Sequence, residues 1–293
     1  MSKRVSVIIL GGSHAGLAVS HKLLRQTPRA AVTLINPSDE YYFNIAAPRF
    51  LVKPESLPPS KYIHSIPDTF RKYPAGAFTV KGLVIKIDYS TKSVSVATSA
   101  GSTKDTAALF VFDYPVIASG STTPATLGQA GVKLPFKATA FEDTRNAIHE
   151  AQETLKSARR TVIGGAGPLG VEIAGELVEA AGSKKVTLVS RTKVFLDGAT
   201  EPVQKTVLSL LRRMDINVLT KVTVNNAQYE TDTQTWKVKL STRRIVTADA
   251  YIAITGTIPN NEFIPKSLLN SEGWVNVDRQ LRVMEDGALA LIR

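Results

Sequence analysis

The chain of 293 residues contains no cysteine, and this absence excludes several kinds of chemistry. Without thiols there can be no disulfide bond, no C-x-x-C redox pair and no thiolate ligand for zinc or an iron–sulfur cluster. Any redox reaction therefore requires a bound organic cofactor. The four histidines show no metal-binding spacing, so we expect no metal site. They are His14, His21, His64 and His149.

Long hydrophobic runs are lacking as well. The longest apolar segments, such as residues 107–112, are far too short to cross a bilayer. Strand-like sequence begins at Val5, which leaves no room for a signal or transit peptide, and Ser2 is not the glycine that myristoylation requires. We therefore expect a cytoplasmic protein without a transmembrane segment. Peripheral association with mitochondrial or lipid membranes is an open alternative.

Acidic residues are too few to balance the basic ones, and the chain carries a net charge of +11. Such an excess is typical of nucleic-acid-binding proteins. The basic residues, however, come in scattered pairs, without a basic run or interleaved aromatic residues. A solvated basic surface therefore explains the charge better than a nucleic-acid groove, and an anionic membrane surface is the third alternative. The hydrophobic content of 43% suits a globular chain of two domains.

What the sequence does have is a strand, a glycine-rich turn and a helix in direct succession, in T-V-I-G-G-A-G-P-L-G-V-E. Its glycines fit the pattern G-x-G-x-x-G. Gly165 permits the tight turn, Gly167 lets backbone N–H groups approach a pyrophosphate, and Gly170 lets the helix pack closely on the strand. Pro168 suits the first position of a helix, and apolar residues then recur on one helical face. The pattern predicts a dinucleotide site, with a glycine turn of any α/β fold as the plain alternative.

The same arrangement occurs near the N-terminus, in R-V-S-V-I-I-L-G-G-S-H-A-G. Gly11 and Gly16 take the outer glycine positions, and Ser13 stands where the middle glycine is expected. A Cβ there hinders the close approach of a pyrophosphate, although the hydroxyl can donate a hydrogen bond in compensation. Asn36 and Ser190 each follow the next predicted strand, 25 residues after the first glycine of their motif, where such folds expect an acidic residue. The two motifs are therefore interpreted as copies of one nucleotide-binding unit.

The segment G-G-S-H-A has a second interpretation, as the nucleophile elbow of an α/β hydrolase in which Ser13 attacks an ester. The elbow requires several strands before it, whereas only one predicted strand precedes Ser13. We therefore favour the nucleotide site. We expect His14 to lie beside a phosphate at the start of the helix.

The remaining elements are predicted from periodicity and from turn residues. We expect a loop at 41–52, a surface connection at 53–67, strands at 78–87 and 93–96, buried strands at 114–120 and 251–260, helices at 141–155 and 202–214, a meander at 222–240 and a last strand at 274–283. The apolar seam of the helix at 202–214 would consist of Val207, Leu210 and Leu211. Asp278 is expected at a turn.

The order of these parts resembles the flavoproteins with two dinucleotide-binding domains, the pyridine nucleotide-disulfide oxidoreductase superfamily. Within it the chain is most similar to the apoptosis-inducing-factor-like, ferroptosis-suppressor type, and more distantly to type II NADH dehydrogenases. The resemblance extends over most of the chain, and its most specific part is F-N-I-A-A-P-R. The other segments that carry it are G-G-S-H-A-G, V-T-L-I-N, V-I-A-S-G-S, V-I-G-G-A-G-P-L-G-V-E, V-T-L-V-S-R and I-T-G-T-I-P-N.

This resemblance implies an α/β fold of two Rossmann-like three-layer (ββα) dinucleotide-binding domains, the second inserted into the first. Residues 1–120 and 249–293 would form the FAD-binding domain, and residues 121–248 the NAD(P)H-binding domain. The chain would leave the FAD domain at Ser119–Gly120 and re-enter it at Thr255–Gly256.

The resemblance also implies roles for single residues. The first glycine motif would hold the pyrophosphate of FAD and Asn36 its ribose, while Arg49 would contact FAD and Val84 would lie near the adenine. The second motif would hold NAD(P)H, with Glu172 on the nicotinamide side. Arg49 as a surface cation and Glu172 as a solvated helix residue are the plain alternatives. Together, the motifs and the resemblance give these cofactor-binding residues: Gly11, Gly12, Ser13, His14, Ala15, Gly16, Asn36, Arg49, Val84, Ser119, Gly120, Gly165, Gly167, Pro168, Gly170, Ser190, Arg191, Lys193, Thr255 and Gly256.

The C-terminal part departs from the family. Its members continue into a Gly-Asp motif whose aspartate binds the flavin, and then into a C-terminal domain. Here Asp286 and Gly287 stand in the reverse order, and the chain given ends at Arg293. We expect a chain that lacks both features, which leaves the retention of FAD, the acceptor site and the oligomeric state open.

Ser190, Arg191 and Lys193 favour NADPH over NADH as the reductant. They replace the acidic residue that would repel a 2′-phosphate, and they supply two cations near its expected place. The function that follows is a FAD-dependent NAD(P)H oxidoreductase, which passes a hydride from nicotinamide to flavin and electrons to a quinone-like or other small-molecule acceptor. The alternative is a nucleotide-binding relative with little or no turnover and a regulatory or structural role.

Overall fold

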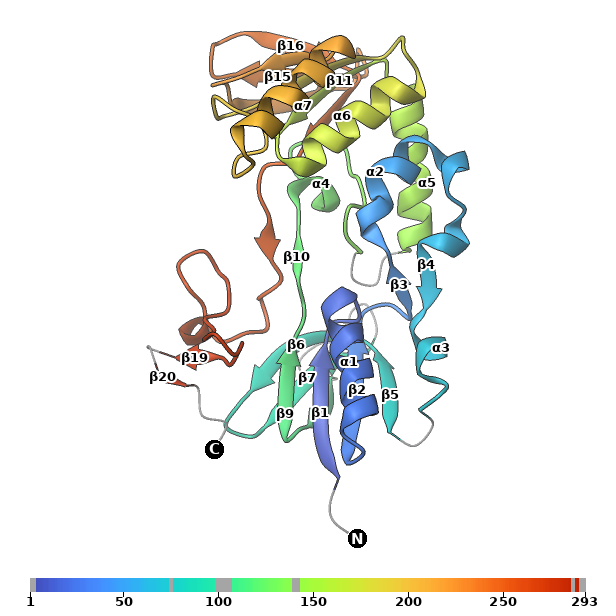
Figure 1. Cartoon of the computed structure of the whole chain (residues 1–293), viewed down its shortest axis with the longest axis vertical. Helices are drawn as coiled ribbons and strands as arrows, with labels where there is room; N and C mark the ends of the chain where they lie inside the picture. Colours follow the sequence, from blue (N-terminus) through green and yellow to red (C-terminus); the bar gives the residue numbers. More distant parts are fainter. Residues whose placement is uncertain (1–3, 74–75, 99–106, 139–142, 286–287, 290–293) are drawn as a thin grey trace. The chain divides into compact units, whose positions relative to one another are not determined.

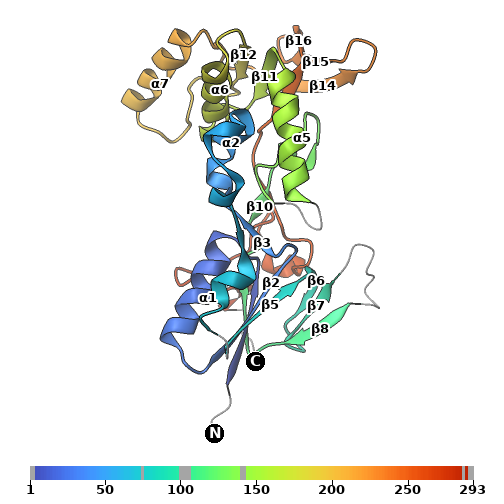
Figure 2. The ribbon, with the colours of Figure 1, turned by 90° about the vertical axis from the view of Figure 1, so that its right-hand side faces the viewer.

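The computed structural model describes residues 4–73, 76–98, 107–138, 143–285 and 288–289 (Figures 1 and 2). The chain forms two units, each with its own core. The first unit consists of Met1–Tyr42, Ile63–Ser121 and Pro259–Arg293, and the second of Phe43–Tyr62 and Thr122–Ile258. Each unit contains one of the two glycine motifs. Asp286 and Gly287 lie outside the described residues.

The first unit is built on a parallel sheet with the strand order β5-β2-β1-β9. These strands are β1 (Val5–Leu10), β2 (Ala30–Asn36), β5 (Ala77–Lys81) and β9 (Tyr114–Ile117). Successive side chains of β1 point to opposite faces, and both faces are covered. Val7 and Ile9 belong to one buried cluster, whereas Ile8 and Leu10 belong to another. An unbroken apolar run is therefore what this central parallel strand requires.

Different elements cover the two faces of this sheet. On the face of Val7 and Ile9, the cluster includes residues of α1 (His14–Gln26) and α3 (Ile66–Phe70). On the face of Ile8 and Leu10, it includes residues of an antiparallel meander. The meander strands are β6 (Leu83–Asp88), β7 (Ser93–Ala97) and β8 (Ala108–Val111). The result is the predicted three-layer ββα arrangement.

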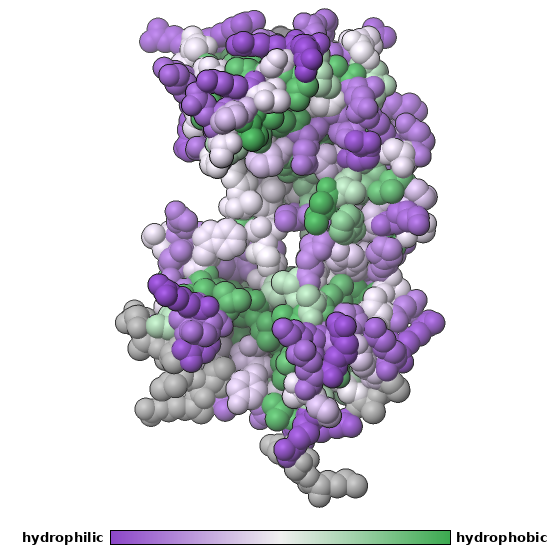
Figure 3. Space-filling view, in the orientation of Figure 1, coloured by the Kyte–Doolittle hydropathy of each residue, from purple (hydrophilic) through white to green (hydrophobic). Residues whose placement is uncertain are grey.

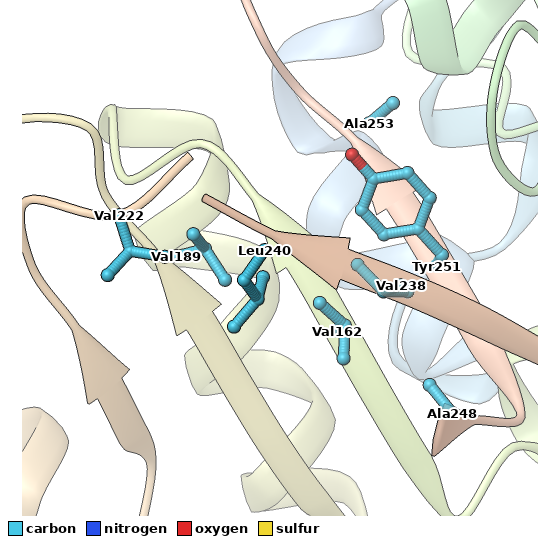
Figure 4. Close-up of a cluster of buried hydrophobic side chains, with 8 residues drawn as sticks. All are labelled: Val162, Val189, Val222, Val238, Leu240, Ala248, Tyr251 and Ala253. Carbon is cyan, nitrogen blue, oxygen red and sulfur yellow. The ribbon is translucent and has the colours of Figure 1, made fainter. Parts of the chain in front are cut away.

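The second unit repeats this architecture. Its parallel sheet has the order β13-β12-β11-β17, and its meander the order β14-β15-β16. The strands are β11 (Arg160–Gly164), β12 (Lys185–Val189), β13 (Asn217–Leu219), β14 (Val224–Glu230), β15 (Thr235–Leu240), β16 (Ile245–Ala248) and β17 (Ala250–Ala253). Figure 4 shows the cluster between sheet and meander, in which Val162, Val238 and Tyr251 meet. The α/β fold class and the duplication are thus confirmed.

Three helices of the second unit differ in how much they bury. Helix α6 (Pro168–Ala180) follows the second glycine motif and buries Ile173, Ala174 and Leu177. Helix α5 (Thr144–Ser157) begins at the N-cap Asp143, whose side chain accepts hydrogen bonds from two backbone N–H groups of the first turn. Helix α7 (Glu201–Arg213) buries only Leu211. The expected seam of α7 is therefore wrong at Leu210, which is 42% exposed.

The loop expected at 41–52 is wrong, because most of it is ordered secondary structure. The segment contains the end of β3 (Glu40–Tyr42), the 3-10 turn η1 (Asn44–Ala46) and helix α2 (Ala47–Val52). Phe50 and Leu51 are fully buried, and the Phe50 carbonyl accepts a hydrogen bond from Gln152 of α5 at 2.8 Å. The helix depends on these tertiary contacts, which local sequence patterns do not contain.

Two expected strands also need correction. The segment at 114–120 forms β9, but Tyr114 is 60% exposed because β9 lies at an edge of its sheet. The segment at 274–283 is not a continuous strand and pairs only through isolated bridges, Leu269 with Val275 and Val277 with Val283. Asp278 does lie at a turn, where its carboxylate accepts hydrogen bonds from the N–H groups of Gln280 and Arg282 at 2.9 Å.

Short elements complete the described chain. They are η2 (Pro54–Ser56), η3 (Pro59–Lys61), β4 (Ile63–Ser65), β10 (Ser121–Thr122), α4 (Pro124–Leu127), β18 (Ile258–Pro259), η5 (Lys266–Leu268), β19 (Met284–Glu285) and β20 (Ala288–Leu289). The pairs β3 with β4 and β10 with β18 form two-stranded ribbons at the points where the chain passes between the units.

Two leucines of the second unit test this assignment of its core. Leu177→Ala should lower the free energy of unfolding by about 2–5 kcal/mol, because Leu177 is fully buried and the change leaves a cavity. The matched change Leu210→Ala on α7 should stay within about 0.5 kcal/mol, because Leu210 is exposed. Urea unfolding followed by the fluorescence of Trp236 in a Trp274→Phe background would measure both. Equal losses would contradict the assignment.

Candidate functional site

The second glycine motif brings backbone so close to backbone that side chains are excluded at two positions. An ideal Cβ on Gly165 would lie 2.1 Å from the carbonyl oxygen of Ile254, and Gly165 has φ +124°. An ideal Cβ on Gly170 would lie 1.9 Å from the carbonyl oxygen of Gly165. Helix α6 therefore crosses the end of β11 at a distance that only glycine permits.

The start of α6 has the properties of an anion site. Gly167 is the N-cap, no side chain caps the helix, and Pro168 occupies its first turn. The first turn contains no acidic residue, so nothing there opposes the positive end of the helix dipole. An ideal Cβ on Gly167 would meet no heavy atom within 4 Å. The residues present therefore fit a pyrophosphate approaching the N–H groups of the first turn.

Ser190 follows β12, at the position expected beside the adenosine ribose. Its side chain is buried, and its hydroxyl lies 3.1 Å from Thr192 Oγ1 and 3.4 Å from the carbonyl oxygen of Val194. These contacts hold residues 190–194 in a tight turn. Arg191 and Lys193 of this loop are exposed. The loop thus presents two cations and no carboxylate between residues 190 and 193.

Glu172 lies in the first half of α6. Although Glu172 is exposed, partial desolvation, and then the negative charge of Glu176 one turn further on, raises its pKa above the ordinary value. On the other side of the motif, Ile254 donates its N–H to the Gly164 carbonyl at 2.8 Å, and Gly256 follows with φ +81°. Thr255 and Gly256 therefore leave the sheet directly beside the glycine turn. Their contact with NAD(P)H, like that of Glu172, stays a prediction.

The first motif has the same backbone geometry. An ideal Cβ on Gly11 would lie 2.3 Å from the carbonyl oxygen of Ala118, and Gly11 has φ +115°. An ideal Cβ on Gly16 would lie 1.8 Å from the carbonyl oxygen of Gly11. Ser13 is the N-cap of α1, and its hydroxyl makes no capping hydrogen bond. The serine therefore leaves the first turn of α1 open, and Ala15 is exposed there.

Two side chains next to this motif are held by contacts within the chain. His14 Nδ1 lies 2.9 Å from the hydroxyl of Tyr41. The N–H of Gly12 donates to Asn36 Oδ1 at 2.8 Å. Val84 lies on β6 and packs against the buried cluster of the meander. The predicted contacts of these residues with FAD stay predictions.

Hydrogen bonds between Ser119 and Asn260 join two segments of the first unit that are far apart in the sequence. Ser119 Oγ donates to the Asn260 carbonyl, and Asn260 Nδ2 donates to the Ser119 carbonyl, both at 2.8 Å. The Asn260 N–H also donates to the carbonyl of Gly120, which has φ +66°. Ser119 and Gly120 are among the predicted site residues, whereas Asn260 is not. The polar residue in I-T-G-T-I-P-N was the available signal.

Arg49 lies on α2 and faces α6 within the second unit. Its Nε lies 2.6 Å from Glu176 Oε1, while Lys53 Nζ lies 3.0 Å from Glu176 Oε2 and 2.7 Å from Glu179 Oε2. The hydrogen bond to Glu179 raises the pKa of Lys53. Lys53, Glu176 and Glu179 are not among the predicted site residues. The predicted contact of Arg49 with FAD stays a prediction.

Within the described residues, no group of three or more His, Asp or Glu side chains is placed to hold a metal ion. Nor does any described helix combine the length and apolarity needed to cross a bilayer. Hydrophilic residues cover much of the visible surface of both units (Figure 3). The expected cytoplasmic location stays a prediction.

Comparison with known proteins identifies the family. The model of the pyridine nucleotide-disulphide oxidoreductases matches residues 5–290. The chain belongs to this family. Oxidoreductase ptaL of Pestalotiopsis fici is 31% identical over 94% of this chain and 73% of its own length. Ferroptosis suppressor protein 1 of Homo sapiens is 26% identical over 96% of this chain and 71% of its own length.

Solved structures show the same fold at lower identity. The water-forming NADH oxidase from Lactobacillus brevis, bound to NADH, has a TM-score of 0.75 at 21% identity. An engineered water-forming NADPH oxidase, a mutant of that protein bound to NADPH, has a TM-score of 0.76 at 19% identity. Both matches cover 95% of this chain but only 60% of the oxidase chains. The chain therefore spans about three-fifths of the length of these structures.

The close backbone approach at Gly170 yields a direct test. Gly170→Ala should destabilise the second unit by at least about 2 kcal/mol, because the new methyl group collides with a carbonyl oxygen that cannot move away freely. Gly175→Ala in the same helix should instead stabilise by about 0.5–1 kcal/mol, because its Cβ would meet only Met214 Cε at 4.0 Å. Chemical denaturation measures both. A tolerated Gly170→Ala would show that the crossing is looser than described.

Proposed function

We propose that the protein is a FAD-dependent NAD(P)H oxidoreductase, in which the first unit binds FAD and the second binds NAD(P)H. The observation that carries the proposal is the duplicated glycine crossing, at Gly11 and Gly16 in one unit and at Gly165 and Gly170 in the other. Family membership supports it. When bound, the flavin would accept a hydride from the nicotinamide and supply electrons to a quinone-like or other small-molecule acceptor.

In this proposal the chain itself contributes binding and placement. The first turns of α1 and α6 offer uncapped N–H groups to the two pyrophosphates. Gly12, Ser13, His14 and Ala15 line the first turn, and Gly167 and Pro168 line the second. Glu172, with its raised pKa, is the candidate for orienting the nicotinamide. Holding both rings in register is the main catalytic task of a protein whose cofactors perform the chemistry.

The loop after β12 favours NADPH. An acidic residue after the second strand would accept hydrogen bonds from the 2′-hydroxyl of NADH and repel the 2′-phosphate of NADPH, whereas Ser190 does neither. Arg191 and Lys193 are exposed and can pair with the phosphate. The engineered NADPH oxidase carries Ala, Arg and Ser where its parent NADH oxidase has Asp, Ala and Met in succession. Ser190, Arg191 and Thr192 have the same order of small residue, arginine and hydroxyl residue.

The visible spectrum of the purified protein tests the proposal. With added FAD it should show bound flavin absorbance, and anaerobic NADPH should bleach that absorbance within one turnover. Added quinone should then restore it. Flavin absorbance that NADPH does not bleach would support the alternative of a nucleotide-binding protein with little turnover. An absence of bound flavin at excess FAD would contradict the assignment of the first unit.

Arg191→Ala tests the choice of reductant. It should weaken the binding of NADPH by about tenfold or more, because a charge-assisted hydrogen bond to the phosphate is lost, and leave NADH binding nearly unchanged. Arg213→Ala, which removes an exposed cation from α7 of the same unit, should affect neither. Titration of both nucleotides by intrinsic fluorescence gives the two dissociation constants. Equal losses for the two nucleotides would contradict the preference for NADPH.

A further inference from the structure

Asn36 ends β2 directly beside the first glycine turn, and its side-chain amide is already engaged on both sides. Its Oδ1 accepts the N–H of Gly12 at 2.8 Å, and its Nδ2 donates to the carbonyl of Ser38 at 2.6 Å. The backbone carbonyl of Asn36 accepts the N–H of Gly82 at 2.9 Å. Asn36 thus connects the glycine turn, the turn after β2 and the turn after β5.

The orientation of this amide follows from its neighbours. Rotating it by half a turn would place the NH2 group against the Gly12 N–H and the oxygen against the Ser38 carbonyl, and both contacts would be repulsive. The side chain also packs tightly, since an ideal Cβ on Gly12 would lie 2.9 Å from Asn36 Cγ and 2.9 Å from Ile66 Cδ1. The amide therefore has one orientation and little room for another.

A carboxylate could make only one of these two contacts. Aspartate could accept the Gly12 N–H, but its second oxygen would face the Ser38 carbonyl at about the same short distance with no proton between them. An acidic residue, which dinucleotide folds use at this position to hold a ribose, would therefore strain this turn. The local geometry requires a group with an acceptor on one side and a donor on the other.

We propose that Asn36 is a positioning residue for the first dinucleotide site, fixing the glycine turn through Gly12 and Ser38. The inference rests on the proposed function in that the turn is taken to hold the pyrophosphate of FAD. With these two hydrogen bonds made, the amide keeps one N–H and one lone pair for a ribose. The Asn36 amide is uncharged and offers a ribose no charge-assisted hydrogen bond. The affinity of this site for FAD therefore depends on the shape of the glycine turn.

Asn36→Asp separates this role from simple ribose binding, because protonation restores the missing donor. A protonated carboxyl group can donate to the Ser38 carbonyl as the amide does, so the folded protein raises the pKa of the new aspartate above its unfolded value. A group with a raised folded pKa contributes stability that is present at low pH and lost as pH rises through that pKa. The damage should therefore be large at pH 8 and small near pH 4.5.

Charged groups around the turn need to be accounted for in this pH profile. Lys81 of β5 is paired in register with Asn36, and Lys81 Nζ lies 3.8 Å from Asp39 of the turn after β2. Glu40 begins β3, and His14 stands two residues beyond Gly12 at the start of α1. All four are present in the wild type too, so the titration that does not depend on residue 36 cancels in the difference between wild type and variant. What remains is their interaction with the new carboxylate, in which the attraction of Lys81 opposes the rise in pKa that the Ser38 carbonyl causes.

The experiment measures the melting temperature of the apoprotein from pH 4.5 to pH 8 and its affinity for FAD by quenching of flavin fluorescence. Asn36→Asp should melt roughly 3–8 °C below wild type at pH 8, with the gap closing toward pH 4.5. It should bind FAD roughly tenfold more weakly at pH 8 and recover at low pH. Asn217→Asp, the same change at an exposed position of β13, should show neither effect.

A variant that melts like wild type at every pH, and binds FAD equally well or more tightly, would overturn the proposal, since a ribose partner gains from a carboxylate. Should Asn36→Asp fail to fold, hydrogen exchange in the wild-type apoprotein decides: protection of the Gly12 amide supports the proposal, and fast exchange overturns it. Failure of the wild type to bind FAD would contradict the proposed function alone. The melting and exchange results would then still decide the role of Asn36.

Discussion

The architecture of both units depends on one steric constraint, the crossing of a helix over the end of a parallel strand at backbone contact. At Gly170 the space for a Cβ is occupied by the carbonyl oxygen of Gly165, and at Gly16 it is occupied by that of Gly11. No adjustment of side chains can relieve such a collision, so the turn either has glycine or a different shape. Because of the crossing, the first turn of the helix extends beyond the end of the strand. A pyrophosphate can reach the backbone N–H groups of that turn. The crossing is present in both units of this chain, and the fold is shared with structures of about 20% identity.

The glycine crossing does not determine which side chains stand at the ends of the neighbouring strands. Asn36 and Ser190 occupy equivalent places after β2 and β12, and neither is acidic. Asn36 uses its amide to hold the adjacent turns, whereas Ser190 turns its hydroxyl into its own loop and leaves Arg191 exposed. The two copies therefore share the backbone geometry of the glycine turn and differ in the side chains that follow the second strand. This division is expected when a binding site is carried by backbone geometry and its specificity by a few side chains.

The sequence predicted the features that local rules determine. The glycine spacing of the two motifs and the proline of α6 each require one backbone shape, and both were confirmed. The features that depend on distant partners were missed. Residues 47–52 were expected to be a loop, because the contacts of α2 come from distant residues. The Phe50 carbonyl, for example, accepts a hydrogen bond from Gln152 of α5, about a hundred residues away. The exposure of β9 depends on the strand order, and the segment at 274–283 has an alternating pattern but only isolated bridges. The hydrogen bonds of the Asn36 side-chain amide could not be predicted either, since they depend on the conformation of the turn after β2.

The charges between α2 and α6 bear on which residue of α6 can act in chemistry. Glu172, Glu176 and Glu179 lie at successive turns, and a helix face with three carboxylates is unfavourable without cations. Lys53 and Arg49 pair with Glu176 and Glu179, and the hydrogen bond to Lys53 lowers the pKa of Glu179. These ion pairs join α2 to α6 within the second unit. For the exposed Glu172, partial desolvation and the charge of Glu176 instead act together to raise the pKa. The pKa values of Glu172 and Glu179 are therefore shifted in opposite directions on one helix.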